Sequence, residues 1–227
     1  MRKLVASLTV LALAACGGNQ PPTVDASRVL HQAANTMALL HTVSATFKFT
    51  KAPITFEGFT LAGAKTAVQL PGESDTTFTV KQQDVSFAIE LVISDGAYLR
   101  LPFSTFQRLT AAQAAALPDL AQVFNPGTGL PAVIPAGAAP RYVSTDKVDG
   151  KDAYRIATSY SADQVHSLLA QLNGTGSVSA TIWVGTTDLY IHKAVLEGTF
   201  GDGGKLADVE VDITGFNATV TITSPSP

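Results

Sequence analysis

Cys16 is the residue of this sequence whose chemistry is easiest to assign, because it is the only cysteine among 227 residues. A thiolate is a strong nucleophile, but a single cysteine can form neither an internal disulfide nor a cysteine-based metal site. The residues before it have the layout of a secretory signal peptide, since the basic start Met1-Arg2-Lys3 leads into an apolar stretch at 4–12. That stretch is too short to cross a bilayer as a permanent helix, which takes about 20 residues.

The sequence around this cysteine also has the small residues that a lipidation signal requires. Leu13-Ala14-Ala15-Cys16, followed by Gly17-Gly18, resembles the bacterial lipobox, in which a peptidase cuts just before a cysteine that receives diacylglycerol. We therefore expect a signal peptide at 1–15 and lipidation of Cys16. Acyl chains such as palmitate contribute about 0.8 kcal/mol per buried CH₂, so two or three of them hold a protein firmly on a bilayer. The alternative is a chance cysteine at the end of an ordinary signal peptide.

The rest of the chain is expected to lie outside the cytoplasm. Residues 16–25 are small and polar with a proline pair, which predicts a lipidated tether. Residues 26–227 are of a length typical of one domain, and they show neither an internal repeat nor a domain boundary. None of their stretches reaches about 18 consecutive apolar residues, so we expect a body anchored by lipid to the extracytoplasmic face of the cell membrane.

The composition excludes some partners. Without the signal peptide, 13 basic and 18 acidic residues remain, a net charge of −5. Such a surface argues against a nucleic-acid partner and against adhesion to anionic headgroups by charge alone. The chain is 46% hydrophobic but only 15% charged, below the typical quarter. A chain so poor in charge must bury much apolar area or keep some of it for a ligand.

Catalytic and metal-binding signals are weak, and we expect no enzyme, no cofactor and no metal. The four histidines show no metal-ligand spacing: His31, His41, His166 and His192. Ser144-x-x-Lys147 matches a penicillin-binding pattern, but that pattern requires the start of a buried helix, whereas 143–148 is predicted to be a strand. The sequence contains no G-x-S-x-G, P-loop or G-x-G-x-x-G motif.

Three helices are predicted. The first covers 26–41, where apolar residues recur at helical spacing. The second opens on a capping-box pattern at Thr110 and runs to about Val123, broken or restarted by Pro118. The third covers 161–172, opening on another capping box and stopping at an Asn-Gly pair.

Most of the remaining sequence alternates between apolar and polar residues, which predicts about ten to twelve antiparallel strands with one apolar face. A run at 219–223 is counted among these strands. The candidate positions on the apolar face are Phe47, Phe49, Phe78, Val80, Phe87, Ile89, Leu91, Ile182, Val184, Val209, Val211 and Ile213. Periodicity alone favours a filled core for these positions.

The stretch at 124–140 is apolar, yet its prolines and glycines prevent a long helix or strand. Apolar loops of this length are uncommon in compact domains and are often functional. Two interpretations are equally supported. The stretch is either a surface loop packed on its own side chains or the mouth of a cavity. The candidate mouth residues are Phe124, Leu130, Val133 and Ile134.

These motifs, in their order and spacing, resemble the LppX/LprAFG family of actinobacterial lipoproteins over essentially the whole mature chain. The motifs are the lipobox, Phe124-Asn125-Pro126-x-x-Gly129-Leu130, Val148-Asp149-Gly150 followed by Tyr154-Arg155, Trp183-Val184, and Asp212-Ile213-Thr214-Gly215-Phe216-Asn217. The resemblance implies an α+β fold in which a strongly curved antiparallel sheet, a half-barrel, encloses a large apolar cavity under helices on its concave face. It also implies kinship of fold with the carriers of the Lol system.

The function implied by the resemblance is binding of acylated lipids or lipoglycans and their movement through the cell envelope. The low aromatic content (7%) and the alanine-rich segment at 110–123 depart from the family pattern and predict a cavity of different shape. A second hypothesis is a surface module that docks on an envelope partner such as a transporter. It requires a filled core and an exposed apolar patch of several hundred Å². An envelope-polymer hydrolase is the third and weakest hypothesis.

Overall fold

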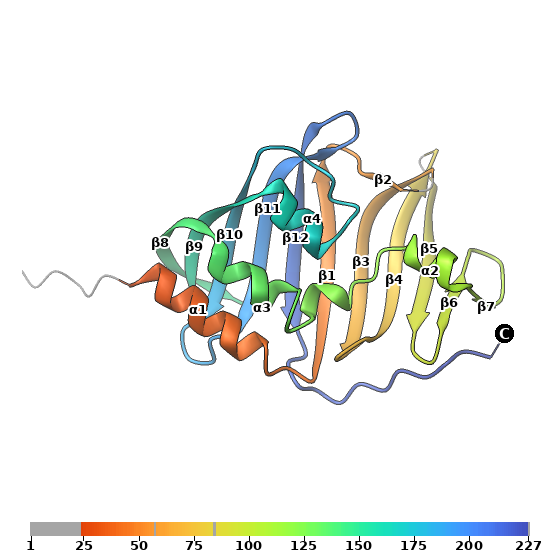
Figure 1. The fold of residues 1–227 in the computed structure, drawn as a ribbon, viewed down its shortest axis with the longest axis horizontal. Helices are drawn as coiled ribbons and strands as arrows, with labels where there is room; N and C mark the ends of the chain where they lie inside the picture. The colour runs from red at the N-terminus through yellow and green to blue at the C-terminus, as the bar shows by residue number, and fades with distance from the viewer. Residues whose placement is uncertain (1–23, 57, 84, 227) are drawn as a thin grey trace, which may run out of the picture.

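The structure is a computed structural model that describes residues 24–56, 58–83 and 85–226, and Figure 1 shows its fold. The predicted signal peptide and most of the predicted tether, including Cys16, lie outside the described residues. The main element is a curved antiparallel sheet. Its strands are β1 (Thr42–Lys51), β2 (Thr55–Phe56), β3 (Phe59–Gln69), β4 (Glu73–Gln82), β5 (Val85–Ile93), β6 (Ala97–Arg100), β7 (Gln107–Arg108), β8 (Ala138–Val148), β9 (Lys151–Ser161), β10 (Ser177–Gly185), β11 (Ile191–Gly201) and β12 (Lys205–Thr214).

The strand order shows two meanders joined at the middle of the sheet. The order is β7-β6-β5-β4-β3-β1-β12-β11-β10-β9-β8, with the short β2 paired to β3. The two meanders meet where β1 pairs with β12, for example at Phe47 and Val211. β7 and β8 are the two ends of this order and do not pair with each other. The sheet is therefore an open half-barrel, as predicted, within the predicted range of strand number.

The chain between β7 and β8 must cross the sheet from one edge to the other. This crossing segment (residues 109–137) runs over the face that also carries the other helices (Figure 1). It contains α2 (Ala111–Ala115), the 3-10 turn η1 (Gln122–Phe124), α3 (Leu130–Val133) and the 3-10 turn η2 (Ile134–Ala136). The stretch predicted as a long loop is therefore a series of short helical turns over the sheet, and its last three residues already belong to β8.

Two further helices complete the layer on this face. α1 (Ala26–Met37) is capped by Asp25, whose Oδ1 accepts a hydrogen bond from the backbone nitrogen of Arg28 at 3.0 Å. It packs against α3, η2, β8 and β10. α4 (Ala162–Leu168) follows β9 directly and opens on the predicted capping box at Ser161. The apolar stripe of each helix faces the sheet, so both helices cover its concave side.

All three predicted helices are shorter than predicted, and α1 ends at Met37 rather than at residue 41. α2 ends at Ala115, because Pro118 lacks a backbone N–H and disfavours a helical conformation at the residue before it. α4 ends at Leu168, since Leu169 has extended backbone angles (φ −150°, ψ 105°). Leu169 and Leu172 are nevertheless buried, so their apolar spacing reflects burial of a coil segment. The predicted strand at 219–223 is wrong, because the chain beyond Thr214 does not join the sheet.

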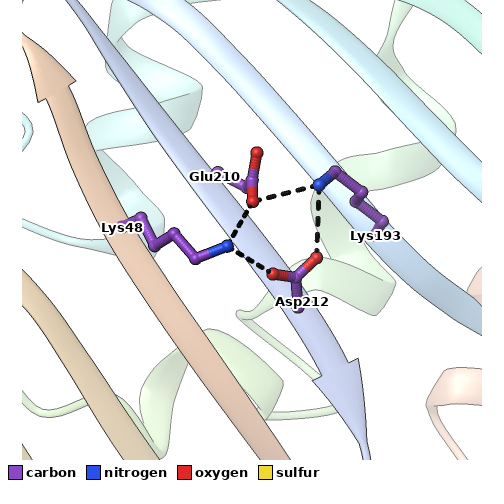
Figure 2. A network of polar contacts seen from close by, with 4 residues as sticks. All are labelled: Lys48, Lys193, Glu210 and Asp212. Atoms are coloured by element: carbon purple, nitrogen blue, oxygen red, sulfur yellow. Dashed lines mark hydrogen bonds and ion pairs between the residues drawn. The ribbon is translucent and has the colours of Figure 1, made fainter. Parts of the chain in front are cut away.

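The convex face of the sheet carries the polar side chains that alternate with the apolar ones along each strand. Figure 2 shows Lys48 of β1 and Lys193 of β11 on either side of two β12 carboxylates. Lys48 Nζ lies 2.7 Å from Glu210 and 3.2 Å from Asp212. Lys193 Nζ lies 3.0 and 3.4 Å from the same two residues. This four-residue network joins β1, β12 and β11 across the seam between the two meanders.

The network predicts a dependence of stability on pH. Hydrogen bonds from Lys48 and Lys193 hold the pKa of Glu210 below its usual value of 4.5. Because this pKa is lower in the folded protein, the stabilisation is present above pH 4.5 and is lost as the pH falls through the folded pKa. We expect Glu210→Gln to lower the melting temperature more at pH 7 than at pH 3, where a larger share of the carboxyl is protonated. An equal loss at both pH values, measured by thermal unfolding at low salt, would contradict this.

Candidate lipid-binding hollows

The first hollow lies between the β12–β11–β10 part of the sheet and the layer of helices. Its volume is about 50 Å³. Its floor comes from β1, β9, β10, β11 and β12, and its roof from the crossing segment and from α4 with the coil after it. The lining residues are Phe47, Val123, Leu130, Val133, Ile134, Tyr160, Val165, Leu168, Leu169, Leu172, Ile182, Ile191, Ala194, Leu196, Val209, Val211 and Ile213.

The second hollow lies over the other meander and is larger, with a volume of about 150 Å³. Its floor comes from β3, β4, β5 and β6, and its roof from the residues that follow α2. Leu101, at its edge, is 44% exposed. The lining residues are Phe59, Leu61, Phe78, Val80, Ile89, Leu91, Leu99, Leu101, Leu117 and Pro118.

The two hollows are close neighbours. Phe47 of the first pairs with Ala64 of β3, and Ala64 in turn pairs with Phe78 of the second. Neighbouring strands lie about 4.8 Å apart. Phe47 and Phe78 are therefore separated by two strand spacings, one on each side of Ala64 in β3. Above them, residues 117–124 form the partition between the hollows. Its first residues line the second hollow, its residue Val123 lines the first, and Leu120 between them is 1% exposed.

The predicted cavity residues divide between the two hollows. Phe47, Ile182, Val209, Val211 and Ile213 line the first hollow. Phe78, Val80, Ile89 and Leu91 line the second. Three others line neither: Val184 is fully buried in the core, whereas Phe49 and Phe87 are half-buried against it. These three lie toward the ends of their strands, and strand phase does not distinguish the end of a strand from its middle.

The predicted mouth residues differ in burial, since Leu130 and Val133 are half-buried whereas Phe124 and Ile134 are buried. Leu130, Val133 and Ile134 line the first hollow as part of its roof. Phe124 lines neither hollow and is 1% exposed in the core. The reason is the strand order: the crossing segment must span the concave face, so its apolar side chains point down onto the sheet. The self-packed surface loop therefore does not describe this segment, and a mouth at Leu130 and Val133 stays a prediction.

The sequence contained signals for some residues that the cavity prediction missed. Four roof residues form the apolar stripe of the third predicted helix: Val165, Leu168, Leu169 and Leu172. The spacing of this stripe predicted burial, but it could not show which surface the stripe would cover. Leu117 and Pro118 gave no such signal, since a Leu-Pro pair after a short helix is ordinary at a helix end.

Tyr160 ties the roof of the first hollow to its floor. Its hydroxyl donates a hydrogen bond to the backbone oxygen of Ile134 at 3.0 Å. Burial raises the pKa of Tyr160 above its usual value of 10.0, so the phenol keeps its proton and remains a donor at physiological pH. This bond satisfies both polar atoms beside an otherwise apolar space.

The Asn-Pro-x-x-Gly part of the crossing segment is a tight turn. Asn125 Oδ1 accepts hydrogen bonds from the backbone nitrogens of Gly127 at 2.9 Å and Thr128 at 3.2 Å. A Cβ at Gly129 would lie 2.5 Å from the backbone oxygen of Val123 and 2.7 Å from two backbone atoms of Asn125. Since backbone atoms on both sides cannot give way cheaply, glycine is required at this position.

We expect Gly129→Ala to lower the free energy of unfolding by about 1–3 kcal/mol, because the added methyl group overpacks the turn. Gly127→Ala is the matched control, since its Cβ would make an ordinary contact of 3.6 Å. Urea unfolding of the two variants measures the difference. Equal stability of the two variants would show that the turn can relax around the methyl group.

Neither a metal centre nor a membrane-spanning helix is found in the described ranges. These ranges contain no group of three His, Cys, Asp or Glu residues that could hold a metal ion. His192 Nε2 lies 3.1 Å from both carboxylate oxygens of Asp188, and the His192 ring contacts the Phe216 ring edge-on at 5.1 Å between centroids. No helix in the described part of the chain is both long and apolar enough to cross a bilayer.

The comparison with known families decides which group this fold belongs to. The family model described as LppX_LprAFG lipoprotein matches residues 25–222. The chain belongs to the LppX/LprAFG family. The family assignment made from the sequence is thereby confirmed, and it associates this protein with the cell envelope.

Relatives and solved structures of this family agree with the fold. Proteins named lipoarabinomannan carrier protein LprG, from Mycobacterium bovis and Mycobacterium tuberculosis, are 28% identical over 167 residues, 73% of this chain and 67% of theirs. LprF from Mycobacterium bovis has a TM-score of 0.70 at 18% identity, covering 89% of this chain and 97% of that one. LppX from Mycobacterium tuberculosis has a TM-score of 0.62 at 14% identity, covering 87% and 97%. LprG is named a carrier, in agreement with the expectation that this family member is not an enzyme.

Proposed function

We propose that this LppX/LprAFG protein binds the acyl chains of lipids or lipoglycans in its two hollows and carries them through the cell envelope. The observation that supports this most strongly is the pair of carbon-lined spaces on the concave face, each with a floor of paired strands and a roof of short, separate segments. The name of LprG, a lipoarabinomannan carrier, supports an acylated lipid or lipoglycan as the ligand. The process needs no bond-making step, since burying acyl groups supplies the binding energy.

The size of the hollows shows what must move when a ligand binds. A cavity of about 150 Å³ lined by Leu, Ile and Phe accommodates a benzene-sized ligand, so neither hollow holds a long acyl chain in this conformation. The floor is held by continuous strand pairing from β7 to β8. The roof consists of α3 and α4, each no longer than two turns, of the eight-residue partition, and of the coil after α4. Short segments with few backbone hydrogen bonds open at lower cost than a sheet. We therefore infer that the roof rises and that the hollows merge as the partition moves.

Native mass spectrometry of the full chain, purified without detergent, tests this proposal. We expect a mass in excess of the polypeptide and its own modifications, released on denaturation and identified as an acylated lipid. A protein that carries no such mass, and that also fails to acquire one from added fatty acid or diacylglycerol, would refute the proposal. Variants of the hollows described below then locate the binding.

We further propose that the protein is held on the membrane by acyl chains on Cys16, a residue outside the described part of the chain. The lipobox-like sequence at 13–16 supports this. Expressed in a bacterium that processes lipoproteins, the chain should incorporate labelled palmitate, and Cys16→Ser should abolish that incorporation. Gly17→Ala serves as the matched control and should keep the label. Palmitate retained by Cys16→Ser would contradict this anchor. The separate proposal that the hollows bind lipid would not be affected.

A further inference from the structure

The connection between β6 and β7 carries an unusual apolar projection. In this tip (residues 101–106), the side chain of Phe103 is fully exposed, at 102% of its reference area. Its backbone has φ of +63°, in the left-handed region that bulky residues rarely adopt. An exposed aromatic ring and a left-handed backbone both cost free energy, and such strain is kept where a function uses it. No internal contact of Phe103 compensates for either cost.

The turn that presents this ring is well defined. The hydroxyl of Ser104 accepts a hydrogen bond from the backbone nitrogen of Leu101 at 3.1 Å and donates one to the backbone oxygen of the same residue at 2.9 Å. The backbone nitrogen of Ser104 also donates to Leu101 at 3.2 Å. These bonds close a compact loop, so the outward direction of Phe103 is built into the turn.

The tip is continuous with the second hollow. Leu101 lines that hollow and is also 44% exposed, so its side chain reaches both the interior space and the surface. The guanidinium of Arg100 stacks over the Phe106 ring at 4.9 Å from its centroid. The tip thus has an exposed aromatic ring at Phe103 and, at its base, the basic side chain of Arg100, which also pairs with Glu90. Aromatic and basic side chains are common at the boundary between headgroups and acyl chains.

We propose that the tip docks on the surface of a lipid bilayer and brings the second hollow into contact with the acyl chains there. This inference rests on the proposed function, because the hollow behind the tip is where we place a chain. A bilayer is the partner whose chemistry fits the position of Leu101, which is exposed at the surface and also lines the second hollow. Acyl groups of the bilayer would touch the exposed tip, and the same kind of group would enter the hollow. The tip and the start of α1 lie at opposite ends of the long axis of the molecule (Figure 1), so a tether before α1 does not by itself bring the tip to the membrane.

Quenching by brominated lipids tests the contact directly. The full chain with Phe103→Trp is mixed with vesicles of phosphatidylcholine and phosphatidylglycerol that carry bromine on their acyl chains. Leu39→Trp is the matched control, since Leu39 is 75% exposed and follows α1, away from both hollows. We expect the fluorescence of the Phe103→Trp protein to fall by about half, as for an aromatic ring at the interface. The control should show only the background of Trp183. Equal quenching of both proteins, or quenching of neither, would overturn the docking proposal.

Transfer measurements separate this inference from the proposed function. Phe103→Ser should slow the uptake of a fluorescent fatty acid from vesicles by about tenfold, as expected when a partly buried phenylalanine contact is lost. It should leave the affinity for the same fatty acid in free solution unchanged. Unchanged uptake from vesicles would refute docking by the tip. This holds even if Phe103→Ser weakens contact with another envelope protein. If the parent protein binds the fatty acid from neither source, the proposed function itself fails.

Discussion

Phenylalanine in place of Val80 should lower the affinity of the protein for an acylated lipid by about a hundredfold and leave it folded. Val80 lies in β4, is 2% exposed and lines the second hollow. The substitution adds four carbon atoms to a space of about 150 Å³, which has room for a benzene-sized group. Four ligand methylenes would lose their place, at about 0.8 kcal/mol each, a total of about 3 kcal/mol. Filling a cavity commonly stabilises a protein, so the melting temperature should stay or rise.

Displacement of a fluorescent fatty acid measures this affinity, with thermal unfolding of the same samples as the check on folding. Val195→Phe is the matched control. It makes the same change on β11, in the polar phase of the strand between the hollow residues Ala194 and Leu196. The control should bind like the parent. Parental affinity in the Val80→Phe protein would mean that acyl chains do not enter the second hollow.

Removal of the Phe124 side chain should lower the free energy of unfolding by about 3–5 kcal/mol. Phe124 is 1% exposed and belongs to the main hydrophobic core, where η1 of the crossing segment meets the sheet layer. Phe124→Ala therefore leaves a large cavity in a region that cannot collapse freely around it. Urea unfolding monitored by circular dichroism gives the value.

The comparison with Phe103→Ala shows whether burial is the cause. Phe103 is fully exposed, and its loss should change stability by no more than about 0.5 kcal/mol. If Phe124 lay at a flexible mouth, the two substitutions would have similarly small effects on stability. That outcome would contradict the placement of the crossing segment across the concave face.

The alternation of side chains allowed most of the sheet to be predicted from the sequence. Phe47, Phe78 and Val211 were placed on the apolar face, and all three face the hollows in the structure. This works because the side-chain period of a strand is two, and a slip by one residue would turn every apolar group to solvent. The half-barrel and its open edges came from the family resemblance, since periodicity carries no information on strand order.

The partly predicted regions are those in which tertiary contacts override local pattern. Residues 219–223 alternate like a strand, yet β12 already has β1 and β11 as its two neighbours, so no free edge remains beside β12 for this run. The apolar stripe after Ser161 predicted a helix to residue 172, but the helix ends at Leu168 while burial continues. The part of the crossing segment after Val123 was predicted as a loop because its path depends on where β8 lies, which local sequence does not specify.

The most direct test of the central claim is to locate a bound acyl chain by nuclear Overhauser effects. The protein would carry protonated, ¹³C-labelled isoleucine and valine methyl groups in a deuterated background, with a protonated fatty acid as ligand. We predict contacts from the acyl methylenes to Ile182 and Val209 in the first hollow and to Val80 in the second. Contacts confined to methyl groups of the convex face, such as those of Val195, with none to these three residues, would contradict the claim that the concave hollows hold the cargo.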